Sequence, residues 1–154
     1  MRIVVDSREQ LAFTFTGFGC EVEPGALAVG DYSLAGLTDK VAVERKSLAD
    51  LVLCLGRERD RFQRELQRAA ALQAFLVVVE APWSDLASGN YRSQLNANSA
   101  CQSVLAFSCR YRVGFMFAGD RTEAERITHG YLRHYLRSAQ DRLQAIVKAH
   151  GSAA

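Results

Sequence analysis

The chain has 154 residues, 49% of them hydrophobic, and a formal net charge of +2 at pH 7. This length and composition predict one globular domain, residues 1–154, with a buried core and no second domain. The net charge is too small to indicate a nucleic-acid partner by itself. Arginine greatly outnumbers lysine, however, and its guanidinium group is better suited than an ammonium group to bidentate hydrogen bonding with phosphates.

The four cysteines argue against two kinds of site. They form no CxxC pair and have no ligand spacing with the three histidines, so neither a zinc site nor a disulfide framework is supported. No charged-then-apolar leader opens the chain, and no apolar run is long enough to cross a bilayer. We therefore expect a soluble protein in a reduced cytoplasmic or nuclear compartment, without a membrane partner.

The first apolar run, residues 2–6, predicts a strand that ends at Asp6, and a polar turn containing Arg8 and Glu9 follows it. Strand ends are where open α/β sheets bind their ligands. Taken alone, Asp6 and Arg8 would be a turn residue and a surface arginine. Their interpretation as site residues depends on the motif downstream.

Two further stretches predict strands that lead to acidic residues. Residues 20–34 predict two short strands around Pro24-Gly25 and Val29-Gly30, and Asp31 follows the second glycine. The alternating apolar residues of 40–46 predict another strand, with strand-like sequence between it and Asp31. A meander would therefore bring Asp31 beside the end of that strand.

The strand over 40–46 ends in three charged residues, Glu44-Arg45-Lys46. Side chains two apart in a strand share a face, so Glu44 and Lys46 point one way and Arg45 the other. We expect the carboxylates of Asp6 and Asp31 to converge with Glu44 beside the Lys46 ammonium group. Such a cluster is able to hold Mg²⁺ against a phosphate.

Ser47 is placed to cap a helix that runs to Leu55, with Asp50 at its third position, so we interpret Asp50 first as a helix cap. A second helix after Gly56 carries four arginines at spacings of four, three and four, which places them on one face: Arg57, Arg61, Arg64 and Arg68. The stripe fits a solvated face partly neutralised by acidic neighbours, or a surface that contacts nucleic-acid phosphates. Beside an acidic site we favour the second interpretation.

The later elements complete an α/β fold, a mixed central β-sheet flanked by helices. Consecutive apolar residues predict a central strand over 74–80, buried on both faces. We interpret the polar segment 82–98 as a mobile loop, in which Trp83 either stacks on a base or anchors the packing. A helix over 99–111 and a strand over 113–118 follow.

A final helix is predicted from residue 122 to 150, longer than a small sheet needs for cover. Its apolar residues form one stripe: Ile127, Tyr131, Tyr135, Ala139, Leu143, Ile146 and Val147. Part of this stripe should be available to a partner. We expect a homodimer that uses the same patch on both subunits.

The pattern Gly30-Asp31, Glu44-Arg45-Lys46 and Asp50, with the upstream Asp6-Ser7-Arg8-Glu9, resembles the motif of the XPF-type structure-specific DNA endonucleases. These form a branch of the restriction-endonuclease-like superfamily. The resemblance covers nearly the whole chain. It implies the restriction-endonuclease-like fold and the hydrolysis of phosphodiester bonds in branched or flap DNA, at junctions of duplex and single strand. It also implies a dependence on Mg²⁺, for which Mn²⁺ substitutes, and a location at the nucleoid or in the nucleus.

Roles for the motif residues follow from the charges that hydrolysis must stabilise. Asp31 and Glu44 would bind the metal ion, as the resemblance also implies, with the Arg45 carbonyl as a third ligand and Asp6 in support. Lys46 would orient the attacking water. Arg8 would hold a phosphate, and Glu9 is at most a supporting acid.

The chain departs from the family after Asp120, where only one long helix follows. Family members usually append a tandem helix-hairpin-helix module, and many carry a helicase domain; we expect neither here, so a separate DNA-gripping or helicase subunit would be a partner. Two alternatives stay open. One is a catalytically silent DNA-binding scaffold, against which the intact motif argues. The other is a phosphate-binding α/β domain unrelated to nucleic acid, which the lack of a glycine-rich phosphate loop disfavours.

Overall fold

The computed structural model describes residues 1–151, which form six strands and five helices in the order β1-β2-β3-β4-α1-α2-β5-α3-α4-β6-α5. The strands are β1 (Arg2–Asp6), β2 (Glu21–Gly25), β3 (Tyr32–Leu34), β4 (Val41–Lys46), β5 (Ala74–Val79) and β6 (Gly114–Phe117). The helices are α1 (Leu48–Leu55), α2 (Arg59–Ala69), α3 (Trp83–Ser88), α4 (Ala97–Tyr111) and α5 (Arg121–His150).

All of these strands join one mixed sheet in the order β2-β1-β3-β4-β5-β6. β1 pairs in parallel with β2, while β3 runs antiparallel to both of its neighbours, β1 and β4. β4, β5 and β6 are parallel to one another, so the ends of β4 and β5 meet at the same edge. The expected mixed sheet is confirmed, and β5 lies inside it, as its apolar sequence predicts.

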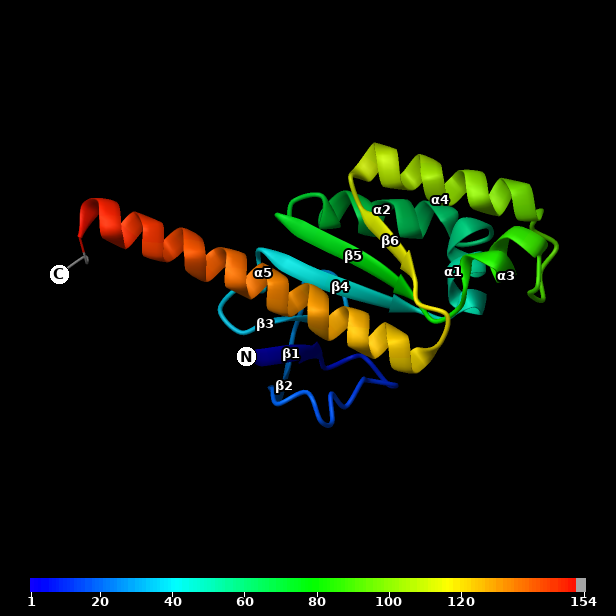
Figure 1. Cartoon of the computed structure of the whole chain (residues 1–154). Helices are drawn as coiled ribbons and strands as arrows, with labels where there is room; N and C mark the ends of the chain where they lie inside the picture. The colour runs from blue at the N-terminus through cyan, green and yellow to red at the C-terminus, as the bar shows by residue number, and fades with distance from the viewer. Residues whose placement is uncertain (152–154) are drawn as a thin grey trace.

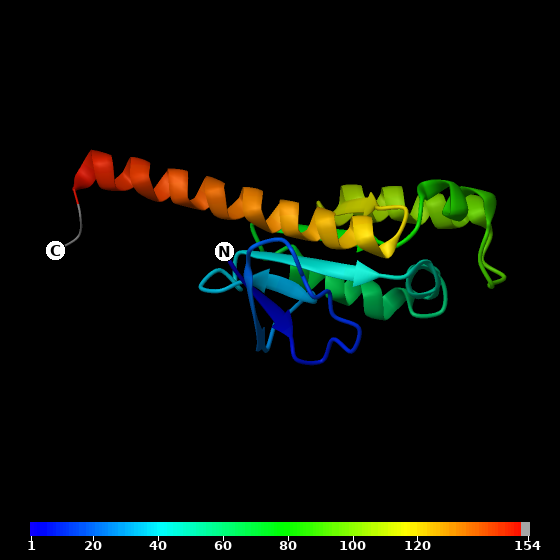
Figure 2. The ribbon, with the colours of Figure 1, turned by 60° about the horizontal axis from the view of Figure 1, so that its bottom comes forward.

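Helices cover both faces of the sheet (Figures 1 and 2). One core forms between the sheet and the helices α1, α2 and α4, and a second core forms between the sheet and α5. β5 contributes to both cores because successive side chains of a strand point to opposite faces. Val77 and Val79 belong to the first core, and Leu76 and Val78 to the second.

Helix α5 extends well beyond the sheet, as Figure 1 shows. Its first half packs on the sheet through the buried residues Ala124 and Leu132. In its second half, Leu143 and Ile146 are 61% and 53% exposed, so this part of the apolar stripe covers no other element among residues 1–151. No helix in the described part of the chain, α5 included, has an apolar stretch that would cross a membrane.

Two expectations for the helices are corrected. The segment expected to be a loop contains α3, which begins after Pro82 and ends at Gly89 in a left-handed conformation, φ 71°. Trp83 packs edge-on against Phe117, with ring centroids 5.0 Å apart, which supports the interpretation as a packing anchor, and it is still 39% exposed. The second helix begins later than expected, at Arg59, which leaves Arg57 in the turn before it.

Candidate active site

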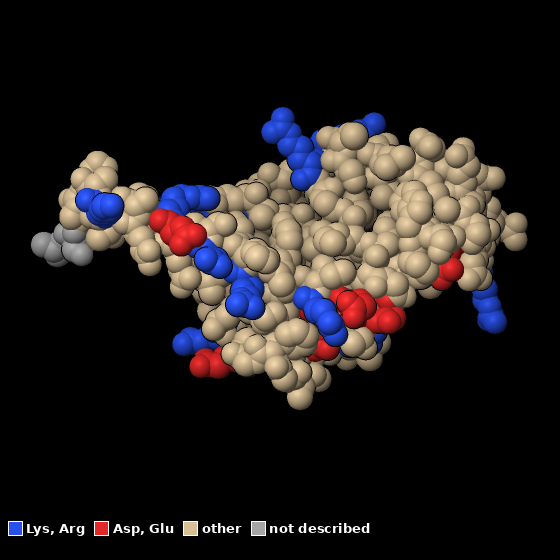
Figure 3. Space-filling view, viewed as in Figure 1, with Lys and Arg blue, Asp and Glu red and all other residues tan. Residues whose placement is uncertain are grey.

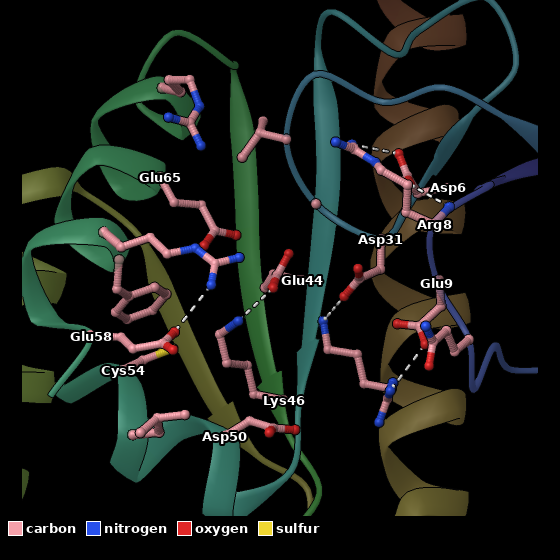
Figure 4. Close-up of a pocket in the computed structure, with 18 of the residues that line it drawn as sticks. Asp6, Arg8, Glu9, Asp31, Glu44, Lys46, Asp50, Cys54, Glu58 and Glu65 are labelled. Atoms are coloured by element: carbon pink, nitrogen blue, oxygen red, sulfur yellow. Dashed lines mark hydrogen bonds and ion pairs between the residues drawn. The ribbon is translucent and has the colours of Figure 1, made fainter. Parts of the chain in front are cut away.

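A cavity of about 680 Å³ opens at the ends of β1 and β4, between the turn after β1 and helix α2 (Figure 4). Its lining includes all of the predicted site residues except Arg57 and Arg64, and it adds Glu58 and Glu65. The fold therefore gathers charged residues from four separate stretches of chain into one place.

The end of β4 directs its charged side chains to both faces of the sheet, as the alternation predicts. Glu44 and Lys46 share the face toward α2, where Lys46 Nζ lies 2.6 Å from Glu44 Oε1. Both residues are buried, at 8% and 9% exposure. Lys46 Nζ also lies 5.3 Å from the centroid of the Phe62 ring, so this pair borders the core.

Gly30 allows Asp31 to approach β4. It has a φ of +82°, and a Cβ at this position would lie 2.9 Å from Ala42 Cβ and 3.1 Å from Val43 O. The backbone N–H of Asp31 donates to Val43 O at 2.8 Å, and the backbone N–H of Arg45 donates to Asp31 Oδ2 at 2.8 Å. The expected meander between the two acidic residues is present, because β3 and β4 pair antiparallel.

Both carboxylates beside β4 have raised pKa values. Burial raises the pKa of Asp31 to about 6; the Arg45 N–H opposes this rise and the charge of Glu9 adds to it. Burial likewise raises the pKa of Glu44 well above its usual range, against the opposing charge of Lys46. Among the hydrogen bonds of the described residues, none reaches Asp31 Oδ1 or Glu44 Oε2. These two oxygens remain available for a cation.

Asp6 is buried at the end of β1, as predicted, but its carboxylate is already paired. Oδ1 accepts from Arg8 N at 2.9 Å and from Arg8 Nε at 2.8 Å, while Oδ2 accepts from Arg8 Nη2 at 2.9 Å and from Leu27 N at 2.8 Å. These hydrogen bonds hold the pKa of Asp6 well below its usual range, and the Arg8 side chain makes the largest contribution. Asp6 therefore orients Arg8 at the cavity wall.

The expected cluster of three carboxylates is not formed. Within residues 1–151, no group of three or more His, Cys, Asp or Glu side chains is arranged to hold a metal ion. The remaining donors, Asp31 and Glu44, are hard anionic oxygens. They fit Mg²⁺, which is commonly bound through one or two carboxylates together with water and substrate phosphates.

Arg45 points to the other face of the sheet, toward α5. Its Nη2 lies 3.1 Å from Glu9 Oε1, and its Nη1 lies 3.3 Å from Glu80 Oε1. Glu9 also accepts a hydrogen bond from Leu11 N at 2.7 Å. Glu9 thus supports Arg45 and the turn after β1. Glu80, which the motif does not include, is a second acidic partner that sequence spacing does not reveal.

Asp50 takes part in the cap of α1 that the sequence predicts. Its backbone N–H donates to Ser47 Oγ at 3.1 Å, and Ser47 Oγ lies 2.7 Å from Asp50 Oδ2. The cap directs the first turn of α1 along the cavity wall, where Asp50 is also exposed to the cavity. The prediction that Ser47 is the N-cap is therefore confirmed, and Asp50 supports this cap from the third position of the helix.

The arginine stripe divides at the cavity. Arg61 and Arg68 line it from α2, whereas Arg64 does not. Glu58 pairs with Arg61 at 3.2 Å, and the charge of Glu65 contributes to the raised pKa of Glu44. Positions three before and four after Arg61 share its face of a helix, so their spacing could have identified both acids as neighbours of the site.

The sequence model of the ERCC4 domain matches residues 5–131. This chain belongs to the ERCC4 domain family. The matched range contains every residue that lines the cavity, so the family assignment covers the site as well as the sheet. The resemblance to the XPF-type endonucleases is confirmed.

Two solved structures of XPF from Aeropyrum pernix have the same fold. XPF from Aeropyrum pernix aligns with a TM-score of 0.72 and 24% identity, over 99% of this chain and 76% of that chain. XPF from Aeropyrum pernix in complex with DNA aligns with a TM-score of 0.70 and 23% identity, over 89% of this chain and 66% of that chain. No curated protein matches this ERCC4 domain. The two structures show that it has the restriction-endonuclease-like fold of XPF.

Proposed function

We propose that this ERCC4 domain is a metal-dependent DNA endonuclease. The observation that carries the proposal is a pair of carboxylates in an arginine-lined cavity that also contains Lys46: the half-buried Asp31 and the buried Glu44, each with one oxygen that no hydrogen bond of the described residues reaches. The family assignment supports the same reaction class, and a structure of XPF from Aeropyrum pernix contains DNA. An intact acidic centre also disfavours the silent scaffold.

Asp31 and Glu44 would hold Mg²⁺, or Mn²⁺ in its place, with the Arg45 carbonyl as a further ligand. Bound there, the ion would supply Lewis acidity and lower the pKa of a water. The residues of the chain perform the remaining tasks. Burial opposes the charged form of Lys46, but Glu44 and Glu65 raise its pKa above the usual range. Lys46 therefore stays an ammonium group that orients the attacking water and offsets negative charge.

We propose that the substrate is branched or flap DNA, cut near a junction of duplex and single strand. Arg8 lies on the wall of the cavity formed after β1, and the wall formed by α2 carries Arg61 and Arg68 (Figure 4). Arginines on two facing walls suit two backbone segments that diverge at a junction. Such an enzyme would act where DNA is stored, at the nucleoid or in the nucleus.

We further propose a homodimer through the second half of α5. Leu143, Ile146 and Val147 are exposed there, and a second copy would cover them with the same residues. Figure 3 shows a row of basic side chains along the visible side of α5. A separate DNA-gripping or helicase subunit would be a further partner and would add contacts with duplex DNA.

The test is a cleavage assay on flap, branched, single-stranded and duplex DNA, each with and without Mg²⁺. We expect the wild type to cut branched or flap DNA in the presence of Mg²⁺ and Asp31→Asn to cut none. DNA binding without cleavage by the wild type would favour the silent scaffold. Failure to bind DNA at all would favour the phosphate-binding domain unrelated to nucleic acid.

A further inference from the structure

A closed ring of charged side chains joins β4 to three other segments. Arg45 contacts Glu9 at 3.1 Å and Glu80 at 3.3 Å. Arg121 Nη1 donates to the same Glu80 oxygen at 2.8 Å, and Arg121 Nη2 donates to Leu11 O at 2.6 Å. The ring closes because Leu11 N donates to Glu9 Oε1 at 2.7 Å. We call the four charged residues Glu9, Arg45, Glu80 and Arg121 the charged ring.

The charged ring is mostly shielded from water. The side chains of Glu9, Arg45 and Glu80 are 8%, 11% and 13% exposed. Buried charges are tolerated only when they are paired, and loss of one partner leaves the other uncompensated. Arg45 Nε is buried without a hydrogen-bond partner among the described residues, so Arg45 depends on its two terminal nitrogens for orientation. Glu80 is the acid that contacts both arginines.

The charged ring is connected to the candidate site through the backbone of β4. The N–H of Arg45 donates to Asp31 Oδ2 at 2.8 Å, and the N–H of Glu80 donates to Lys46 O at 2.9 Å. Glu80 therefore holds the end of β4 at two points, one through its side chain and one through its backbone. In Figure 4, Asp31 and Glu9 lie on one side of β4, and Glu44 and Lys46 lie on the other.

We propose that Glu80 and Arg121 are positioning residues for the hydrolysis proposed above. Neither lines the cavity. Through Arg45 they fix the last residues of β4, and so the directions in which Asp31 and Glu44 present their free oxygens. A misplacement of about 1 Å in such a site can cost ~10²-fold in rate. This inference rests on the proposed function.

The test uses Glu80→Gln, which keeps the volume of the side chain, and Arg121→Ala, which truncates a partly exposed residue and should therefore fold. We expect kcat to fall by roughly 10- to 100-fold while KM for DNA stays within about threefold. Calorimetric titration should show Mn²⁺ affinity reduced by about fivefold or more. The control is Arg126→Ala, which breaks an exposed ion pair with Glu123 at 3.5 Å within α5, outside the charged ring, and should change neither quantity.

Several outcomes would overturn the inference. Folded variants with wild-type kcat and Mn²⁺ affinity would show that the charged ring only fastens α5 to the sheet. A raised KM with unchanged kcat would make the ring a DNA contact instead. If the wild type cleaves no DNA, the proposed function fails, and a role in hydrolysis fails with it. The Mn²⁺ titration then tests the structural part alone: reduced affinity in both variants shows that Glu80 and Arg121 position Asp31 and Glu44, and unchanged affinity rejects this.

Discussion

Lys46 Nζ and Glu44 Oε1 lie 2.6 Å apart, with both side chains buried on the α2 face of β4. The two residues are separated by Arg45, which points to the opposite face. A buried pair of this kind is stabilising only while both partners are present, because a lone buried charge is costly. A substitution of Lys46 therefore changes the charge of the site while the backbone of β4 keeps its pairing.

Lys46→Met keeps most of the side-chain length and removes the ammonium group. We expect the metal-free variant to lose about 3 kcal/mol of unfolding free energy, because Glu44 is left buried without its partner. The rise in Tm on addition of Mg²⁺ should persist, since Asp31 and Glu44 remain. Single-turnover cleavage should fall by ~10²-fold or more. Wild-type cleavage by the folded variant would remove Lys46 from the reaction.

Asp31→Asn keeps the shape of the side chain and removes one anionic oxygen. The metal-free variant should be at least as stable as the wild type, because burial disfavours the Asp31 charge. The wild type should gain about 2.7 kcal/mol at an Mg²⁺ concentration of about one hundred times Kd, and the variant should gain little. DNA binding should persist because the arginines are unchanged. Full cleavage by the purified variant would refute the assignment.

The stability of the metal-free protein should depend on pH in a predictable direction. Burial raises the pKa of Asp31 from its ordinary value of 3.8 to about 6 in the folded state, and it also raises the pKa of Glu44. Between the ordinary pKa of Asp31, 3.8, and its folded-state pKa of about 6, the folded state binds more protons than the unfolded state. The free energy of unfolding therefore falls as the pH rises through about 6. Tm should therefore be higher near pH 5 than near pH 7. Asp31→Asn should show a smaller difference.

The arginines of α2 offer a matched comparison for DNA binding. Arg61→Ala with Arg68→Ala removes two charges from the cavity wall, and Arg57→Ala with Arg64→Ala removes two charges outside it. The first variant should weaken binding and reduce the salt dependence of log K by roughly one unit of slope per lost phosphate contact. The second should have a smaller effect. Fluorescence anisotropy over a range of salt concentrations measures both. If the two double variants lose the same affinity and the same salt dependence, the arginines that line the cavity contribute no more to DNA binding than those outside it.

The proposed dimer depends on the apolar residues at the far end of α5. Leu143→Glu with Ile146→Glu should yield a monomer, because a two-fold contact would bury four new charges. Gln144→Glu with Ala145→Glu adds the same charge to the same turn on other faces and should leave the dimer intact. Light scattering at high micromolar concentration distinguishes the two. A monomeric wild type under these conditions would exclude the dimer.

Local sequence patterns predicted the parts of the structure that depend on near neighbours. The two-residue period of β4 predicted that Glu44 and Lys46 share a face, and the position of Ser47 predicted the cap with Asp50. The buried run of β5 predicted an interior strand. In each case the interacting groups lie within four residues of one another or follow a simple alternation of burial, so the sequence specifies the geometry.

Features that depend on direction or on distant contacts were not predictable. The sequence predicts Asp6 at a strand end. A spacing of two residues does not specify, however, that the Arg8 guanidinium group donates two hydrogen bonds to the Asp6 carboxylate. Helix α3 has only six residues, too few to show a helical period, and Trp83 packs on Phe117 from a distant part of the chain. Glu80 and Arg121 are 41 residues apart, without any shared period.

The length of α5 has a consequence for how its stability varies from end to end. The first half is protected by the sheet, whereas residues 141–150 are all exposed and are held by their own backbone hydrogen bonds. Isolated helices shorter than about 12–15 residues are marginal in water. In a free subunit, amide hydrogens should therefore exchange slowly near Leu132 and rapidly near Ile146. One continuous helix would then contain both some of the slowest and some of the fastest exchanging amides in the domain.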